Sequence, residues 1–205
     1  MTQDSSEQIG ADSGEWDGWE TEAEPTTEAS GHTGTETGSR LRGKAARRAD
    51  EVRIVSAAMH SLTQYGLEVL TDRGVPGSDG VIEHVVIGNQ GVHVVRSAQL
   101  KGRIRTTKKD IYIGGANCTV LVNGLMARVD TVRHMVGGEC NVAAAFCLTR
   151  VKFGQPKQFG AVTFGNTQAI VEHLARQHRE ADQRLDLANI AEVLDGIFLP
   201  ASMMS

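Results

Sequence analysis

The sequence predicts a mixed α/β fold, in which a β-sheet carries helices on its faces. Its clearest feature is a hairpin, in which two β-branched apolar runs, 81–87 and 92–95, flank the turn Gly88-Asn-Gln-Gly91. Apolar residues recur at helical spacing before this hairpin, over 45–65, and after it, over 119–135. Because the hairpin is apolar on both faces, we expect its strands at the centre of the sheet rather than at an edge.

The other elements are expected on either side of the hairpin, and no internal repeat is visible. Gly66 should end the first helix, Asn166 or Thr167 should cap a helix that begins at Gln168, and Pro200 should stop the last one. In chain order we expect a helix at 45–65, a strand at 67–70, a turn region at 72–80, the hairpin, strands at 101–105 and 110–113, a helix at 119–135, strands at 142–148 and 158–164, and helices at 168–177 and 189–197.

Residues 1–44 are predicted to be a disordered acidic tail with a basic end, which precedes a globular domain at 45–200. The tail is rich in Glu, Thr, Ser and Gly, and ten acids but no Lys or Arg fall in residues 1–39. Trp16 and Trp19 lie within it, either as solvated side chains or as a motif that orders on a protein partner. The tail could also fold back on the basic cluster at 40–48 and compete with anionic ligands.

Charge and cysteine content limit the possible function classes. Residues 40–205 carry 15 acids and 21 bases, a net charge of +6 that supports nucleic-acid binding only weakly. Cys118, Cys140 and Cys147 are odd in number and lack metal-site spacing, so we expect buried reduced thiols in a cytoplasmic protein. No apolar run approaches the roughly 20 residues of a membrane helix, and no signal peptide is recognisable. We therefore expect no membrane partner.

Short motifs around the hairpin carry a family resemblance. They are Pro76-Gly-Ser, Ile82-Glu-His-Val-Val-Ile-Gly88, Gly91-Val-His-Val-Val95, Lys101-Gly-Arg103, Tyr112-Ile-Gly-Gly115 and Leu121-Val-Asn-Gly124. Together they resemble the nuclease-related domain (NERD) family, over about residues 51–164. The resemblance implies a restriction-endonuclease-like core of the PD-(D/E)xK class, and metal-dependent DNA processing is attributed to family members by analogy of fold.

Phosphodiester cleavage of that class has definite chemical needs. Carboxylates at the ends of two central strands hold a divalent metal, usually Mg²⁺, which polarises the phosphate and generates hydroxide. A lysine two residues after the second acid stabilises charge or helps to deprotonate the water. Strand alternation places that lysine on the same face as the acid.

This chain departs from the family pattern at most of those positions. The first acid is present as Glu83, but the second falls at Arg96 and the lysine at Ala98. The glutamine of the long helix falls at Arg128, and the glutamate of the first helix is matched by Glu51. The resemblance therefore implies a remnant site with Glu51 and Glu83 as its acids.

An arginine at position 96 argues against a bound metal. Replacing an acid by Arg changes the charge beside the ion by two units, each worth roughly 4 kcal/mol at about 4 Å and an effective dielectric near 20. We expect Arg96 to form an ion pair with Glu83 in place of the metal. No cofactor is then expected, with Mg²⁺ required only if the nuclease is active.

A relocated site and a nucleic-acid surface are the remaining alternatives. Lys101 is the nearest replacement for the missing lysine, although alternation turns it away from Arg96, and His84 and His93 are expected in the core. The basic run could follow a phosphate backbone or could be a solvated face, since it has no interleaved aromatic residue. This run comprises Lys101, Arg103, Arg105, Lys108 and Lys109.

The sequence therefore favours a catalytically inactive NERD-like protein that binds DNA or RNA or acts as a regulatory module. The alternative is an active Mg²⁺-dependent nuclease that uses Glu51, Glu83 and a displaced base. A third hypothesis is a protein-interaction module that works through the Trp-bearing tail.

Overall fold

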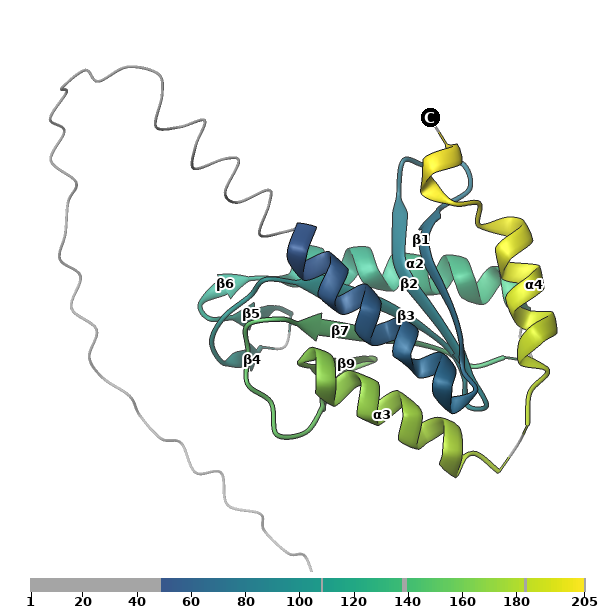
Figure 1. Cartoon of the computed structure of the whole chain (residues 1–205). Helices are drawn as coiled ribbons and strands as arrows, with labels where there is room; N and C mark the ends of the chain where they lie inside the picture. The colour runs from purple at the N-terminus through teal and green to yellow at the C-terminus, as the bar shows by residue number, and fades with distance from the viewer. Residues whose placement is uncertain (1–48, 108, 138–139, 183, 205) are drawn as a thin grey trace, which may run out of the picture.

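The computed structural model of the chain describes residues 49–107, 109–137, 140–182 and 184–204. The predictions made for the acidic tail at 1–44, including Trp16 and Trp19, and for Lys108 lie outside these residues. Within them the fold is α/β, with a mixed central sheet flanked by helices, as the sequence predicts (Figure 1). No helix of this described part is long and apolar enough to cross a membrane.

The central sheet has six strands in the order β1-β2-β3-β7-β9-β8. The first three form an antiparallel meander, β3, β7 and β9 run parallel, and β8 pairs antiparallel at the edge. The strands span Glu68–Gly74 (β1), Val81–Gly88 (β2), Gly91–Ala98 (β3), Val142–Leu148 (β7), Lys157–Phe159 (β8) and Val162–Gly165 (β9). The hairpin β2–β3 is thus internal, and both strands are mostly buried, which confirms the prediction.

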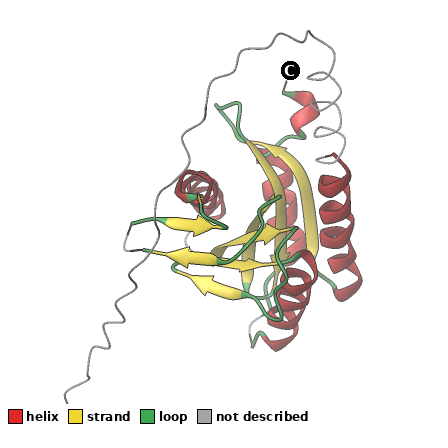
Figure 2. Cartoon of the chain, turned by 90° about the vertical axis from the view of Figure 1, so that its left-hand side faces the viewer, coloured by secondary structure: helices red, strands yellow, loops and turns green. Residues whose placement is uncertain are grey.

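A second, three-stranded sheet is formed by the part of the chain between β3 and the long helix α2 (Thr119–Val136). It contains β4 (Ile104–Thr106), β5 (Ile111–Ile113) and β6 (Ala116–Asn117), paired antiparallel. Figure 2 views the molecule from the side that carries this small sheet. The predicted strand at 101–105 begins only at Ile104, because Gly102 adopts a positive φ of 97° and interrupts the extended chain before it.

Helices cover both faces of the central sheet. On one face lie α2 (Thr119–Val136) and α4 (Leu187–Ile197), which bury apolar side chains such as Leu125, Val129 and Leu194. On the other face lie the helix over residues 49–60, the 3₁₀ helix η1 (Ser61–Tyr65) and α3 (Thr167–Glu180). In Figure 1 this second group lies in front of the sheet and α2 lies behind it. A short 3₁₀ turn, η2 (Ala201–Met203), follows α4.

Local signals explain where several helices begin and end. Gly66 closes η1 in the left-handed conformation, with φ 89°, as predicted. The side chain of Asn166 accepts the backbone N–H of Ala169 and so caps α3. Asp186 caps α4 in the same way through the N–H of Asn189. Pro200 lies beyond the end of α4 and forms an isolated bridge with Arg73 of β1.

The predicted single strand at 158–164 is a hairpin instead. Strands β8 and β9 pair antiparallel, and Gly160 at their turn has a φ of 59°. Periodicity could not reveal this turn, because Phe159 and Val162 continue the apolar pattern on either side of it. Similarly, β1 extends to Gly74 beyond the predicted end at Leu70, since it pairs with β2 as far as Val81.

The buried thiols and imidazoles belong to the core, as expected. All three cysteines are free and buried, and burial raises the pKa of the Cys147 thiol to about 11. His84 and His93 are likewise buried. Burial, and then the nearby charge of His173, lowers the pKa of His93 to about 4.

Replacing His93 by leucine should make folding less sensitive to acid. Because the folded-state pKa lies near 4 and the unfolded value near 6.5, only the unfolded chain gains this proton between those pH values. The contribution of His93 to the free energy of unfolding is therefore fully present above pH 6.5 and falls as the pH is lowered. Between about pH 6.5 and pH 5 this one group should cost about 2 kcal/mol. Urea unfolding at the two pH values measures the difference, which should shrink by that amount in His93→Leu.

The exposed His134 provides the control for this prediction. His134→Gln should show the same loss of unfolding free energy between the two pH values as the wild-type protein. An equal pH dependence in His93→Leu and the wild-type protein would contradict the assignment to His93.

Candidate functional site

The candidate site lies where the parallel strands β3 and β7 end. Their register runs to the pair Ala98–Leu148, and the N–H of Thr149 then donates to the carbonyl of Ala98. The first turn of α2 and the helix over residues 49–60 close the sides of a cavity of about 510 Å³ at this edge. The cavity is lined by Glu51, Val52, Glu83, Arg96, Ser97, Ala98, Gln99, Leu121, Thr149 and Arg150.

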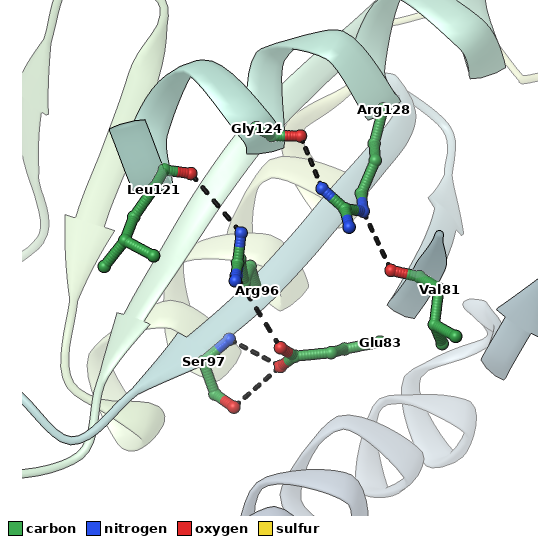
Figure 3. A network of polar contacts seen from close by, with 7 residues as sticks. All are labelled: Val81, Glu83, Arg96, Ser97, Leu121, Gly124 and Arg128. Carbon is green, nitrogen blue, oxygen red and sulfur yellow. Dashed lines mark hydrogen bonds and ion pairs between the residues drawn. The ribbon is translucent and has the colours of Figure 1, made fainter. Parts of the chain in front are cut away.

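Glu83 projects from β2 towards the end of β3, where its carboxylate is held by three groups (Figure 3). The backbone N–H and the hydroxyl of Ser97 both donate to Oε2, each at 2.7 Å. Arg96 Nε lies 3.8 Å from Oε1, which is an ion pair without a hydrogen bond. The predicted Glu83–Arg96 pair is therefore confirmed, and its two side chains are about a quarter exposed, at 27% and 26%.

Arg96 bridges β2 and α2. Besides its ion pair with Glu83, its Nη1 donates to the carbonyl of Leu121 at 3.5 Å, in the first turn of α2 (Figure 3). Ala98 lies two residues further along the same strand and also lines the cavity. Its methyl group supplies no hydrogen-bond donor to the cavity.

Arg128 adds a second guanidinium from α2. Its Nε donates to the carbonyl of Val81 at 2.8 Å, and its Nη1 donates to that of Gly124 at 2.7 Å. Burial lowers the pKa of Arg128, the charge of Arg96 lowers it further, and Glu83 opposes both effects. Arg128 thus connects α2 to the start of β2 by hydrogen bonds and adds positive charge near Glu83.

Glu51 is held on the opposite wall of the cavity. Its Oε2 accepts the hydroxyl of Thr149 at 3.1 Å, and its Oε1 accepts Nε of Arg150 at 3.1 Å. Sequence reasoning missed Thr149, Arg150 and Ser97 as partners of the two acids. A signal for Thr149 and Arg150 was available, because both directly follow the buried strand β7, and polar residues at such positions often form sites.

These contacts do not fit a divalent metal. Each carboxylate oxygen of Glu51 and Glu83 already faces a hydroxyl, an amide or a guanidinium, whereas Mg²⁺ needs carboxylate oxygens that are free to join waters in an octahedral shell. Arg96 and Arg150 also cancel the charge that would attract a cation. Among the described residues, no group of three His, Cys, Asp or Glu side chains could hold a metal ion.

The predicted basic run is not one continuous face. Lys101, Arg103, Arg105 and Lys109 are exposed, but only Arg105 lies within a described strand, β4. Lys101 and Arg103 precede this strand, so the alternation argument that placed three of these residues on one strand face does not hold.

Comparison of the chain with protein-family models, curated proteins and solved structures finds no match in any of the three.

Proposed function

We propose that this chain is a nuclease-related domain of the NERD type, with a restriction-endonuclease-like core, that binds nucleic acid without cutting it. The observation that carries the proposal is that each remaining acid has an arginine partner, Arg96 for Glu83 and Arg150 for Glu51. Two positions where the family supplies metal support, Arg96 and Arg128, are cationic.

The arrangement of the site supports this proposal. In the mixed sheet, Glu83 and Arg96 face one another on adjacent central strands, at the positions where the implied catalytic acids would lie. Replacing a metal by guanidinium groups keeps positive charge at this edge of the sheet. A site of this kind can still attract a phosphate backbone, but it cannot generate a metal-bound hydroxide.

A combined binding and cleavage assay tests the proposal. Labelled single- and double-stranded DNA and RNA are incubated with the purified chain, with and without Mg²⁺ or Mn²⁺. We expect binding that weakens as salt is raised, and no cleavage products in either metal.

Glu83→Ala and Glu68→Ala are the two variants for this assay, because Glu68 is an exposed acid away from the cavity. Metal-dependent cleavage that Glu83→Ala abolishes and Glu68→Ala retains would overturn the proposal in favour of an active nuclease. Absence of any binding to nucleic acid would remove the binding role and leave a protein-interaction module.

A further inference from the structure

A groove next to the candidate cavity gathers positive charge from two distant parts of the chain. It has a volume of about 740 Å³ and lies between the segment 102–104, which leads into the small sheet, and the segment 150–159, which follows β7. In Figure 1 these segments lie at the end of the molecule that carries β4. We call it the basic groove; it is lined by residues 102–104, 150–157 and 159.

The charge in the basic groove has a single sign. Arg103, Arg150, Lys152 and Lys157 line it, and its lining contains no Asp or Glu. Arg103, Lys152 and Lys157 are exposed, and none of the three has an ion-pair partner among the residues that the structure describes. A concave surface that collects unpaired cations attracts a polyanion.

Two aromatic rings accompany these cations. Phe153 and Phe159 line the groove and are only partly buried. The ring of Phe159 is fixed by an edge-on contact with Phe164, with centroids 5.6 Å apart. Cations that follow a backbone, together with aromatic faces for bases, are the pattern by which proteins bind single-stranded nucleic acid. A duplex hides the faces of its bases within its own stack and could use only the cations.

We infer that the basic groove binds single-stranded nucleic acid, with Arg103, Lys152 and Lys157 on the phosphates and Phe153 against a base. This inference rests on the proposed function and assigns it a surface. Arg150 joins the two regions, because it lines both the groove and the cavity while its Nε binds Glu51. The bound nucleic-acid strand would therefore lie beside the remnant site rather than over the small sheet.

The chain offers a closely matched pair of variants to test this assignment. The groove variant is Arg103→Gln/Lys152→Gln/Lys157→Gln. The control variant is Lys101→Gln/Arg105→Gln/Lys109→Gln, which removes the same number of arginines and lysines from exposed positions that do not line the groove. Both triple variants have the same net charge. A difference in their affinity for nucleic acid therefore shows that the location of the cations, in or outside the groove, determines binding.

Binding of a labelled single-stranded oligonucleotide is measured by fluorescence anisotropy over a range of salt concentrations. Three lost phosphate contacts should weaken binding by about 100-fold near 0.1 M salt and should lower the salt slope by about 2. The control variant should change affinity much less. Phe153→Leu should weaken binding about 10-fold with the salt slope unchanged, because a stacking contact releases no counterions.

The outcomes separate the groove from the proposed function. If the unsubstituted chain binds no nucleic acid, both the groove assignment and the proposed function fail. If it binds but the two triple variants lose affinity equally, the groove is wrong and the proposed function stands. Equal affinity for duplex and single strand, or displacement by poly-glutamate at matched charge, would overturn the assignment to single-stranded nucleic acid.

Discussion

Replacing Gly91 by alanine is expected to lower the free energy of unfolding by about 3 kcal/mol, through backbone strain and overpacking. Gly91 opens β3 with a φ of 120°, and a Cβ there would lie 2.1 Å from the carbonyl oxygen of Asn141. That carbonyl accepts the N–H of Val92 at 2.8 Å, so it cannot move away without losing the bond. Denaturant unfolding followed by circular dichroism measures the loss.

Gly115 provides a control that also has a positive φ but no clash. Its φ is 87°, but a Cβ at this position would have no atom within 4 Å. Gly115→Ala should therefore cost only about 1 kcal/mol, from the positive φ alone. Equal losses in the two variants would show that the contact with Asn141 does not constrain the start of β3.

The hairpin could be predicted because its signals are local. Two β-branched runs around Gly88 and Gly91 predict both strands and the turn. Counting outward from the pair Gly88–Gly91 in antiparallel register then places Arg96 opposite Glu83. The free buried cysteines and the position of α2 also follow from local composition and spacing. An ion pair across one hairpin can therefore be predicted from sequence alone.

The rest of the site depends on pairing between distant strands. The parallel register of β3 with β7 brings Thr149 and Arg150 to Glu51, which lies about a hundred residues earlier in the chain. Periodicity within any one segment contains no information on that pairing. The basic groove was hidden for the same reason, because Arg103 and Lys152 belong to segments that only the fold brings together.

Removing the carboxylate of Glu83 should destabilise the protein by about 3 kcal/mol in Glu83→Ala. The loss has two physical causes: the amide and hydroxyl of Ser97 lose their acceptor, and Arg96 loses its counter-charge. Glu83→Gln should cost less, because an amide oxygen can still accept from Ser97. Exposed Glu68→Ala is the control and should change stability by less than about 0.5 kcal/mol.

A double-mutant cycle then shows which role Glu83 has. If it neutralises Arg96, the double variant Glu83→Ala/Arg96→Ala should be more stable than the sum of the single losses predicts, by about 1 kcal/mol. Removing Arg96 also relieves its repulsion with Arg128, which adds to burial in lowering the pKa of Arg128. A metal site predicts the opposite behaviour, since carboxylates that await a cation repel one another and their removal stabilises the unliganded protein. Stabilisation by Glu83→Ala, combined with loss of a Mg²⁺-dependent rise in melting temperature, would therefore identify Glu83 as a metal ligand.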